Sequence, residues 1–279
     1  MGLLSGLEKF GFSLDGDLDI LADEKKEAKE EVKASAAPKV EKDYIIDKKG
    51  KCPICDKPFL YRGVATTRLK RLEPDFDLKP NFEAIDVTKY DVISCPSCGY
   101  TALSNTFDKI DSARMKLVRN GFCPNYKPQF EDLPEIYSYD YAAEKMKLSL
   151  VCTMMKKGKL SEKSYTCLKL AWLRREQIAE LESAEEKDQK LIDELKEEYE
   201  GFYKQAYDGF LKCLTSETPP YCGLPSETLE YMLCHMGVYF KDYDNASKLI
   251  ARLIQSPTTK SKMKDKLVEL KEEIANAKE

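Results

Sequence analysis

Two pairs of cysteines in the first half of the chain have the spacing of a metal-binding site. Cys52 and Cys55 form one Cys-Pro-x-Cys motif, and Cys95 and Cys98 form another. Each motif would place two thiolates on one tight turn, whose backbone N–H groups can donate hydrogen bonds to the sulfur atoms. Two such turns on neighbouring β-hairpins would complete a tetrahedral shell of four sulfurs. The sequence therefore predicts that one metal ion is bound by all four cysteines.

Zinc is the metal that this pattern favours, with iron as the alternative. A tetrahedral site of four sulfurs accepts either metal, and the Cys-Pro-x-Cys-Gly of residues 95–99 is also typical of a rubredoxin-like iron site. Four thiolates leave no coordination position open for water or substrate, so we expect one structural Zn2+ per chain rather than a Lewis acid. Disulfide bonds are the competing interpretation. They are disfavoured because no export signal is apparent, and thiols stay reduced in the cytoplasm.

Short β-type segments surround the two cysteine motifs. Residues 44–46, 59–61 and 90–93 are examples, and proline and glycine separate them. The 39 residues from 56 to 94 exceed the ~15–20 that separate the pairs in a compact zinc site, so an insertion must lie between the hairpins. The sequence predicts a small β zinc-ribbon-like domain, the head, over residues 44–110.

The rest of the chain has the composition of long helices. Beyond residue 134, segments of Leu, Met, Ala, Lys and Glu are interrupted by helix-breaking residues. These are Gly158, Pro219, Pro220, Gly223, Pro225 and Pro257. Three segments, starting at Tyr139, Tyr203 and Tyr243, share the spacing Tyr-x2-Ala-x3-apolar. That spacing is typical of tetratricopeptide hairpins, in which the small residue lets a partner helix approach and the aromatic ring fills the turn.

The two regions together predict an α+β protein. A small β zinc-ribbon-like head precedes an all-α body of tetratricopeptide-like helical hairpins, which we place at residues 111–279. Ala142, Ala206 and Ala246 of the three repeated segments are expected at close helix contacts.

A third region precedes the head. Residues 1–43 begin with an apolar stripe of Leu3, Leu4, Leu7 and Phe10, which predicts a short amphipathic segment. The remainder is rich in Lys, Glu and Ala and has almost nothing apolar to bury, so we expect a charged flexible linker. The amphipathic segment either docks on its own protein or recruits a partner.

The charge balance argues against a nucleic-acid binder. The chain has 45 Lys and Arg against 49 Asp and Glu, a net charge of −4, whereas nucleic-acid binders usually carry a basic surplus. One stretch of the insertion is an exception, because Arg62, Arg68, Lys70 and Arg71 near Tyr61 could contact phosphates and stack on bases. A nucleic-acid-associated regulator using this basic and aromatic insertion is therefore the alternative function.

No enzyme motif stands out in the sequence. Phosphate-loop, dinucleotide, hydrolase and metalloprotease motifs are all missing. His235 is the single histidine and follows Cys234, but adjacent helical side chains point about 100° apart and cannot form a catalytic pair. No apolar run approaches the ~20 residues of a transmembrane helix, so we expect a cytoplasmic protein with no membrane contact.

Further motifs accompany the cysteine pairs. Two of them, Arg68-Leu-Lys-Arg-Leu72 and Asp77-Leu-Lys-Pro80, lie between the pairs. Tyr90-Asp-Val-Ile-Ser94 directly precedes the second pair, and Tyr100 and Phe107 follow it. The last is Phe240-Lys-Asp-Tyr-Asp-Asn-Ala246 in the helical region. In this order, over about residues 44–256, the chain resembles an uncharacterised bacterial family catalogued as domain of unknown function 2225. The resemblance implies a zinc-ribbon-like head on a tetratricopeptide-like helical body. It brings no known activity and no catalytic residues.

These observations converge on a protein that binds other proteins. The predicted metal site is closed, the histidine lacks a partner, and stacked helical hairpins most often hold peptides or helices in their grooves. We therefore predict a scaffold or adaptor with a structural zinc site rather than an enzyme. Its partner would be an unidentified protein or peptide at the helical groove.

Overall fold

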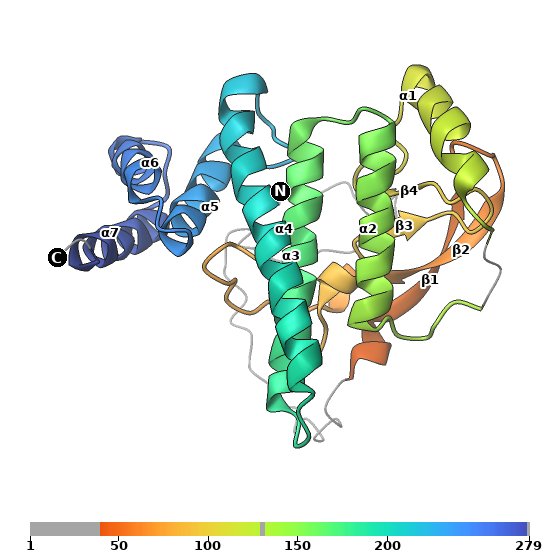
Figure 1. The fold of residues 1–279 in the computed structure, drawn as a ribbon, viewed down its shortest axis with the longest axis horizontal. Helices are drawn as coiled ribbons and strands as arrows, with labels where there is room; N and C mark the ends of the chain where they lie inside the picture. Colours follow the sequence, from red (N-terminus) through yellow and green to blue (C-terminus); the bar gives the residue numbers. More distant parts are fainter. Residues whose placement is uncertain (1–39, 129–131, 278–279) are drawn as a thin grey trace, which may run out of the picture. The chain divides into compact units, whose positions relative to one another are not determined.

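The computed structural model describes residues 40–128 and 132–277. Within them, a small head of antiparallel strands precedes a body made only of helices, as the α+β prediction stated (Figure 1). The amphipathic segment and most of the linker predicted before the head lie outside the described residues. None of the described helices is both long and apolar enough to cross a membrane.

Each cysteine motif lies in the turn that closes one hairpin of the head. The strands are β1 (Ile45–Lys51), β2 (Pro58–Val64), β3 (Val92–Ser94) and β4 (Thr101–Leu103). β1 pairs antiparallel with β2, and β3 pairs antiparallel with β4, in two separate two-stranded sheets. The turns between the paired strands, residues 52–57 and 95–100, both begin with a cysteine. The predicted pair of hairpins is therefore confirmed.

Short helical segments complete the head. They are η2 (Glu41–Tyr44), η3 (Thr66–Arg68), η4 (Val87–Tyr90), α1 (Ser112–Leu117), the π-helical η5 (Val118–Phe122) and η6 (Cys123–Asn125). Val118 and Phe122 share an apolar core with Cys52 and Cys95. The described residues, 40–128 and 132–277, belong to one compact unit. The domain boundary placed at residue 110 stays a prediction, because it concerns which parts of this unit fold independently.

Six helices of the described chain form the body. They are α2 (Tyr139–Met155), α3 (Leu160–Ser183), α4 (Gln189–Ser216), α5 (Ser226–Tyr239), α6 (Tyr243–Gln255) and α7 (Ser261–Asn276). Gly158, Pro219 and Pro257 lie in the connections between them, where the sequence predicts interruptions. The side chains of Ser138 and Asp242 accept hydrogen bonds from backbone N–H groups in the first turns of α2 and α6, as helix caps do.

Helices α3 and α4 form the long hairpin at the centre of the body (Figure 1). Their facing sides bury Trp172, Tyr203, Ala206 and Phe210 in one core. Helices α5 and α6 form a second hairpin, in which a Cβ added at Gly237 would lie only 3.1 Å from the Cβ of Ala246. Helix α7 then packs its apolar face on α5 and α6. The repeated spacings at Tyr203 and Tyr243 therefore lie on the second helices of hairpins, as predicted.

The repeated spacing that begins at Tyr139 lies in a different environment. It is on α2, and no helical hairpin partner precedes α2 in the described chain. Ala142 and Met146 of α2 instead pack on Val92 and Leu103 of the head strands and on Leu170 of α3. A small residue at this position lets a helix approach strands as well as another helix, so the spacing alone does not identify the partner. The tetratricopeptide likeness of the body stays a prediction.

Candidate metal centre and grooves

The four predicted cysteines converge where the tips of the two hairpins meet. Their sulfur atoms all lie within 4.8 Å of one another. The Sγ atoms of Cys52 and Cys98 are 3.5 Å apart, and those of Cys55 and Cys95 are 3.7 Å apart. Tetrahedral zinc with bonds of about 2.3 Å to sulfur would hold its ligands about 3.8 Å apart. All four cysteines are free thiols. The donor set therefore fits one tetrahedral metal ion.

The two cysteine turns share one backbone conformation. The N–H of Asp56 donates to the Cys52 carbonyl, and the N–H of Gly99 donates to the Cys95 carbonyl, each over 2.9 Å. Asp56 and Gly99 both have left-handed backbone angles, with φ of 61° and 77°. Glycine adopts this conformation freely, whereas at Asp56 the Cβ makes it sterically unfavourable. Both turns therefore need a left-handed residue directly after the second cysteine in order to place their two sulfurs on the same side.

Hydrogen bonds among the thiols shift their pKa values in opposite directions. Bonds from the thiols of Cys52 and Cys98 lower the pKa of Cys95 to about 2. Donation to Cys95 raises the pKa of Cys52 to about 12, and contacts with Cys52 and Cys95 raise the pKa of Cys98. Backbone N–H groups of each turn also face its first sulfur and favour the thiolate. Several thiolates this close repel one another, so ionising all four requires a cation among them.

Residues outside the hairpins hold the cysteine turns in place. The guanidinium of Arg119, on η5, donates a hydrogen bond of 2.7 Å to the Ile54 carbonyl in the first turn. The ring of Tyr126 covers the second turn, since a Cβ added at Gly99 would overlap with this ring. Cys123 belongs to the same apolar cluster but not to the group of four sulfurs. No motif in the sequence indicated these supports, because they follow the cysteine motifs by twenty or more residues.

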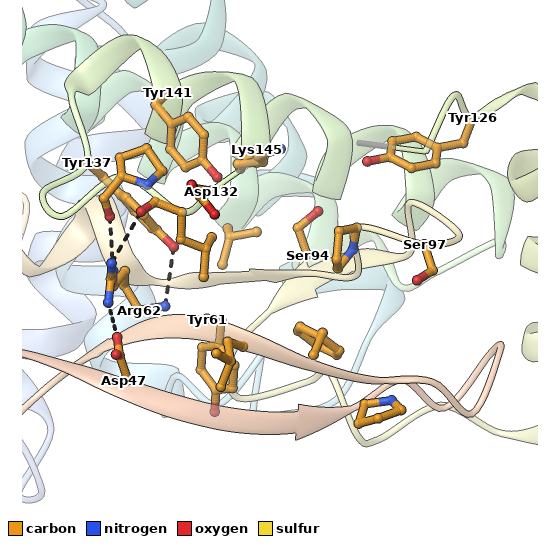
Figure 2. A pocket seen from close by; sticks show the side chains of 17 residues that line it. Asp47, Tyr61, Arg62, Ser94, Ser97, Tyr126, Asp132, Tyr137, Tyr141 and Lys145 are labelled. Atoms are coloured by element: carbon orange, nitrogen blue, oxygen red, sulfur yellow. Dashed lines mark hydrogen bonds and ion pairs between the residues drawn. The ribbon is translucent and has the colours of Figure 1, made fainter. Parts of the chain in front are cut away.

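A groove of about 740 Å³ runs between strand β2, strand β3 and helix α2 (Figure 2). Tyr61 and Tyr141 are among its aromatic lining residues. Arg62 lies at one end of this groove. Its guanidinium pairs with Asp47 and donates a hydrogen bond of 2.9 Å to the Pro134 carbonyl. The N–H of Arg62 also donates to the Tyr137 hydroxyl. The sequence indicated Arg62 as a candidate phosphate contact. In the structure its hydrogen bonds connect β2 to the 132–137 segment.

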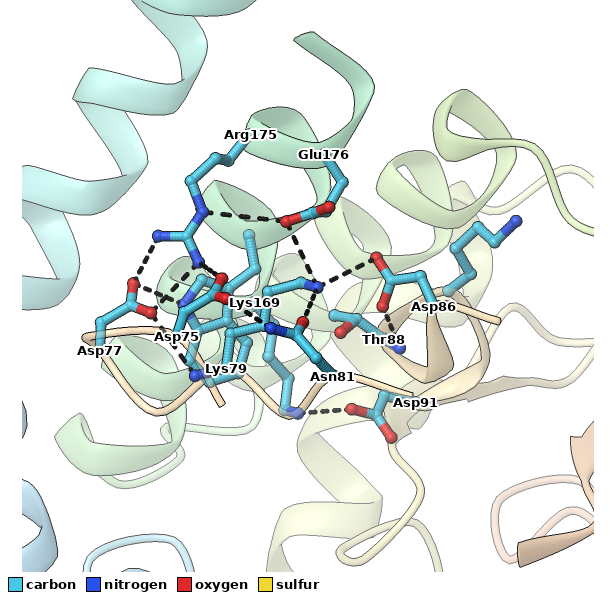
Figure 3. Close-up of polar contacts among 12 residues, drawn as sticks. Asp75, Asp77, Lys79, Asn81, Asp86, Thr88, Asp91, Lys169, Arg175 and Glu176 are labelled. Carbon is cyan, nitrogen blue, oxygen red and sulfur yellow. Dashed lines mark hydrogen bonds and ion pairs between the residues drawn. The ribbon is translucent and has the colours of Figure 1, made fainter. Parts of the chain in front are cut away.

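The insertion between the hairpins is fixed to helix α3 by buried charges (Figure 3). Asp77 is fully buried and accepts hydrogen bonds from Trp172 Nε1 at 2.8 Å and from Arg175 at 2.9 Å. Arg175 also reaches Asp75 at 2.5 Å. Burial by itself lowers the pKa of Arg175, but the facing Asp77 carboxylate outweighs that effect and the pKa is raised. We call this group the Asp77–Arg175 network.

A second buried cation extends the anchoring of the insertion. Lys79 is 3% exposed, and its ammonium group lies 3.3 Å from Glu176 of α3 and 3.1 Å from the Asn81 side chain (Figure 3). Lys169 of α3 pairs with Asp91 at 2.5 Å next to strand β3. The Asp77-Leu-Lys-Pro80 motif therefore fastens the insertion to the body. The sequence singled this motif out only through a resemblance, because its partners lie about a hundred residues further along the chain.

A second groove, of about 640 Å³, lies on the helical body between helices α5 and α7. We call it the α5–α7 groove. Its lining residues are Phe76, Tyr231, His235, Val238, Tyr239, Lys266, Glu269, Leu270 and Glu273. Phe76 comes from the insertion and the others come from the two helices. Phe76 is 43% exposed and Tyr239 is 40% exposed, and they are the two exposed aromatic side chains among the large apolar residues of the described chain.

His235 forms part of the floor of the α5–α7 groove. Its ring lies 4.8 Å from the Tyr231 ring and 6.1 Å from the Phe76 ring. Burial lowers the pKa of His235 to about 4, so the imidazole is neutral near neutral pH. Its Nε2 is buried and has no hydrogen-bond partner among the described residues. Cys234 is fully buried in the cluster between α5, α6 and α7.

Comparison with known proteins gives one result. The family described as "Uncharacterized protein conserved in bacteria (DUF2225)" matches residues 45–274, which is most of the chain and includes both cysteine pairs. No curated protein and no solved structure matches the chain.

Proposed function

The chain belongs to the DUF2225 family of uncharacterized bacterial proteins, and we propose that it is a non-catalytic scaffold or adaptor with a structural zinc site. The exposure of Phe76 and Tyr239 in one groove carries this proposal. The family description names no activity, and the geometry of the metal centre and of the α5–α7 groove supports the proposal.

The cysteine cluster supports the structural half of the proposal. Cys52, Cys55, Cys95 and Cys98 would hold one zinc ion, because their four sulfurs lie within 4.8 Å of one another and two of the sulfur pairs, at 3.5 Å and 3.7 Å, are close to the edge length of a tetrahedral site. When bound, the zinc supplies a positive charge that lets the four thiolates coexist and ties the two hairpins together. With all four positions taken by sulfur, no position is left for a substrate. Iron would bind the same donors, and metal analysis distinguishes the two.

The α5–α7 groove supports the binding half of the proposal. Aromatic side chains are costly to leave in water and are the usual anchors of protein interfaces. Phe76 and Tyr239 line the same groove, with Val238 and Leu270 beside them. A groove between two helices with apolar anchors fits the apolar face of a third helix. The occupant that we propose is therefore an amphipathic helix of a partner protein.

The geometry around the histidine supports a role without catalysis. A nucleophile activated by histidine needs a hydrogen bond to the ring, and the Nε2 of His235 has no partner in the described chain. The neighbouring Cys234 lies in a separate apolar cluster, as the helical geometry predicted.

Site-specific photo-crosslinking in the native cell tests the binding proposal. A photoreactive phenylalanine analogue at Tyr239 should capture a protein, whereas the same analogue at Met154, which is exposed on α2 away from the groove, should not. Phe76→Ala should abolish the crosslink, and Leu60→Ala in the groove beside the head should leave it intact. Equal capture from both positions would contradict the proposal.

Binding to nucleic acid is the outcome that would replace this proposal. The full chain is titrated with a labelled single-stranded oligonucleotide at increasing salt. Tight binding that weakens steeply with salt would support the regulator instead, because phosphate contacts release counterions. We expect weak binding, since Arg62 is engaged with Asp47 and with backbone carbonyls, and Lys70 is paired with Glu83.

A further inference from the structure

Two carboxylates on α7 form one rim of the α5–α7 groove. Glu269 and Glu273 are one helical turn apart, and both line the groove. Neither side-chain carboxylate has an ion pair or a hydrogen bond within residues 40–128 and 132–277. Many other charged residues around the body are paired, including Lys196 with Glu182 and Arg252 with Glu230. The groove therefore has a negative rim without a matching cation.

The cation that does line this groove does not neutralise that rim. The ammonium group of Lys266 lies 3.5 Å from Glu73, which also pairs with Lys262 at 2.7 Å. Its charge is thus directed toward the insertion. Tyr239, at the other side of the groove, donates its hydroxyl hydrogen bond to Glu200, which adds a further carboxylate nearby. The local balance of charge favours a positively charged group in the groove.

The aromatic rings of the groove are suited to the same kind of group. A cation within about 6 Å of a ring centroid is attracted by the negative face of the ring. The guanidinium carbon of Arg175 lies 5.1 Å from the Phe76 centroid, so one face of this ring already holds a cation. Tyr231 and Tyr239 supply further rings. Because His235 is neutral near neutral pH, it does not repel a cation.

We propose that the α5–α7 groove selects a partner helix that carries lysine or arginine beside its apolar side chains, with Glu269 and Glu273 pairing with the basic groups. The inference rests on the proposed function, because it names the chemistry of the partner at the same groove. The apolar side chains of the helix would pack on Phe76 and Tyr239. Its basic side chains would extend past these rings to the carboxylates of Glu269 and Glu273. Long basic side chains can do both, since their stems are apolar.

Two designed peptides test this selection on the full, metal-loaded chain. One is an amphipathic helix of leucine and lysine, and the other is the same helix with glutamate in place of lysine. We expect the leucine–lysine peptide to bind and the leucine–glutamate peptide not to bind. In the variant Glu269→Gln/Glu273→Gln, affinity for the lysine peptide should fall by about tenfold, because two partly exposed ion pairs are lost. Binding by isothermal titration calorimetry provides the readout.

Matched variants separate the charge from the fold. Glu272→Gln removes a carboxylate from the same exposed turn of α7 but outside the groove lining, and it should leave the affinity unchanged. Thermal melting of all variants should coincide, because these side chains are exposed and unpaired. Equal binding of both peptides, binding of neither, or an equal effect of the Glu272 variant would overturn the inference.

The experiment also distinguishes failure of the inference from failure of the proposed function. If Phe76→Ala weakens peptide binding but Glu269→Gln/Glu273→Gln does not, the groove binds helices without selecting their charge, and only the inference is wrong. If the Phe76 variant leaves binding unchanged as well, the peptide binds elsewhere, and the proposed use of the groove is wrong too.

Discussion

The cysteine head and the helical body are stabilised in different ways. Strand β1 exposes most of its residues, and β3 and β4 have three residues each. Around the cysteines, the head core depends on a few rings such as Tyr100 and Phe107. The body instead buries several apolar clusters between long helices, with Trp172 and Tyr203 among its largest buried side chains. Stability is therefore concentrated at one point in the head and distributed in the body.

The two regions should therefore respond differently to a single substitution. A small β domain with little core depends on its metal for folding, so the loss of one ligand should remove most of its structure. A helical core loses only the contacts of the altered side chain. The Asp77–Arg175 network joins the two regions and is expected to lie between these extremes.

Loss of one cysteine should have the largest effect. Cys98→Ser removes one of four sulfurs, and the head should lose its metal and unfold while the helices of the body persist. Structural zinc sites contribute on the order of 10 kcal/mol to folding, far more than the head core can replace. Metal analysis and hydrogen exchange by mass spectrometry provide the readout. A metal-free chain with a protected head would contradict the proposal of a structural zinc site.

The matched control for this substitution is Cys123→Ser. Cys123 packs in the same cluster but lies outside the group of four sulfurs, so the variant should keep one metal per chain. The exchange data also test the predicted domain boundary. If residues 111–126 lose protection together with 44–110, the head extends beyond residue 110.

Breaking the network between the two regions should have the next largest effect. Arg175→Met leaves the fully buried carboxylate of Asp77 without its ion pair, which costs about 3–5 kcal/mol. Lys70→Met removes an exposed pair with Glu83 in the same insertion, and its cost should stay below about 1 kcal/mol. Chemical denaturation measures both. Similar small losses would show that the insertion is not anchored by this network.

Overpacking the helical core should have a graded effect. Ala206→Leu adds bulk where α4 packs in the central hairpin, and we expect a loss of about 1–3 kcal/mol. Gly201→Ala on the same helix meets no atom within 4 Å and should stabilise the helix by about 0.5–1 kcal/mol. Opposite shifts of the melting temperature would confirm the register of α4. A neutral Ala206 variant would contradict it.

The single histidine should produce a smaller, pH-dependent effect. Its ordinary pKa is 6.5, and burial lowers the pKa in the folded chain to about 4. Between these values the unfolded chain binds a proton that the folded chain does not, so stability falls as the pH falls. We expect a loss of about 1.5 kcal/mol between pH 6.5 and about pH 5.

The variant His235→Gln isolates this effect. It keeps the cysteine cluster and the carboxylates, so any loss that they cause at low pH is common to both proteins. The difference between the two denaturation curves should grow as the pH falls toward 5, and the resonance of the single histidine in NMR should titrate near pH 4. A histidine that titrates at its ordinary pKa would show that the floor of the α5–α7 groove is open to water.

Features that depend only on neighbouring residues could be predicted from the sequence alone. The cysteine turns need only a four-residue motif and one left-handed position, here Asp56 and Gly99. Breaks in the body follow Gly158, Pro219 and Pro257, which act on the local backbone. An exception is the break between α3 and α4, where no glycine or proline occurs and Asp188 caps the new helix.

Which distant segments come into contact is seen only in the folded chain. The alanine spacing of α2 predicted a close contact but could not tell a strand partner from a helical one. Arg62 is a residue type that often contacts phosphates, but here its guanidinium donates a hydrogen bond to the Pro134 carbonyl. Phe76 and His235 share a groove although 158 positions separate them. Local motifs specify backbone shape through short-range sterics, whereas burial, ion pairing and grooves arise from contacts that many sequences of the same pattern could arrange differently.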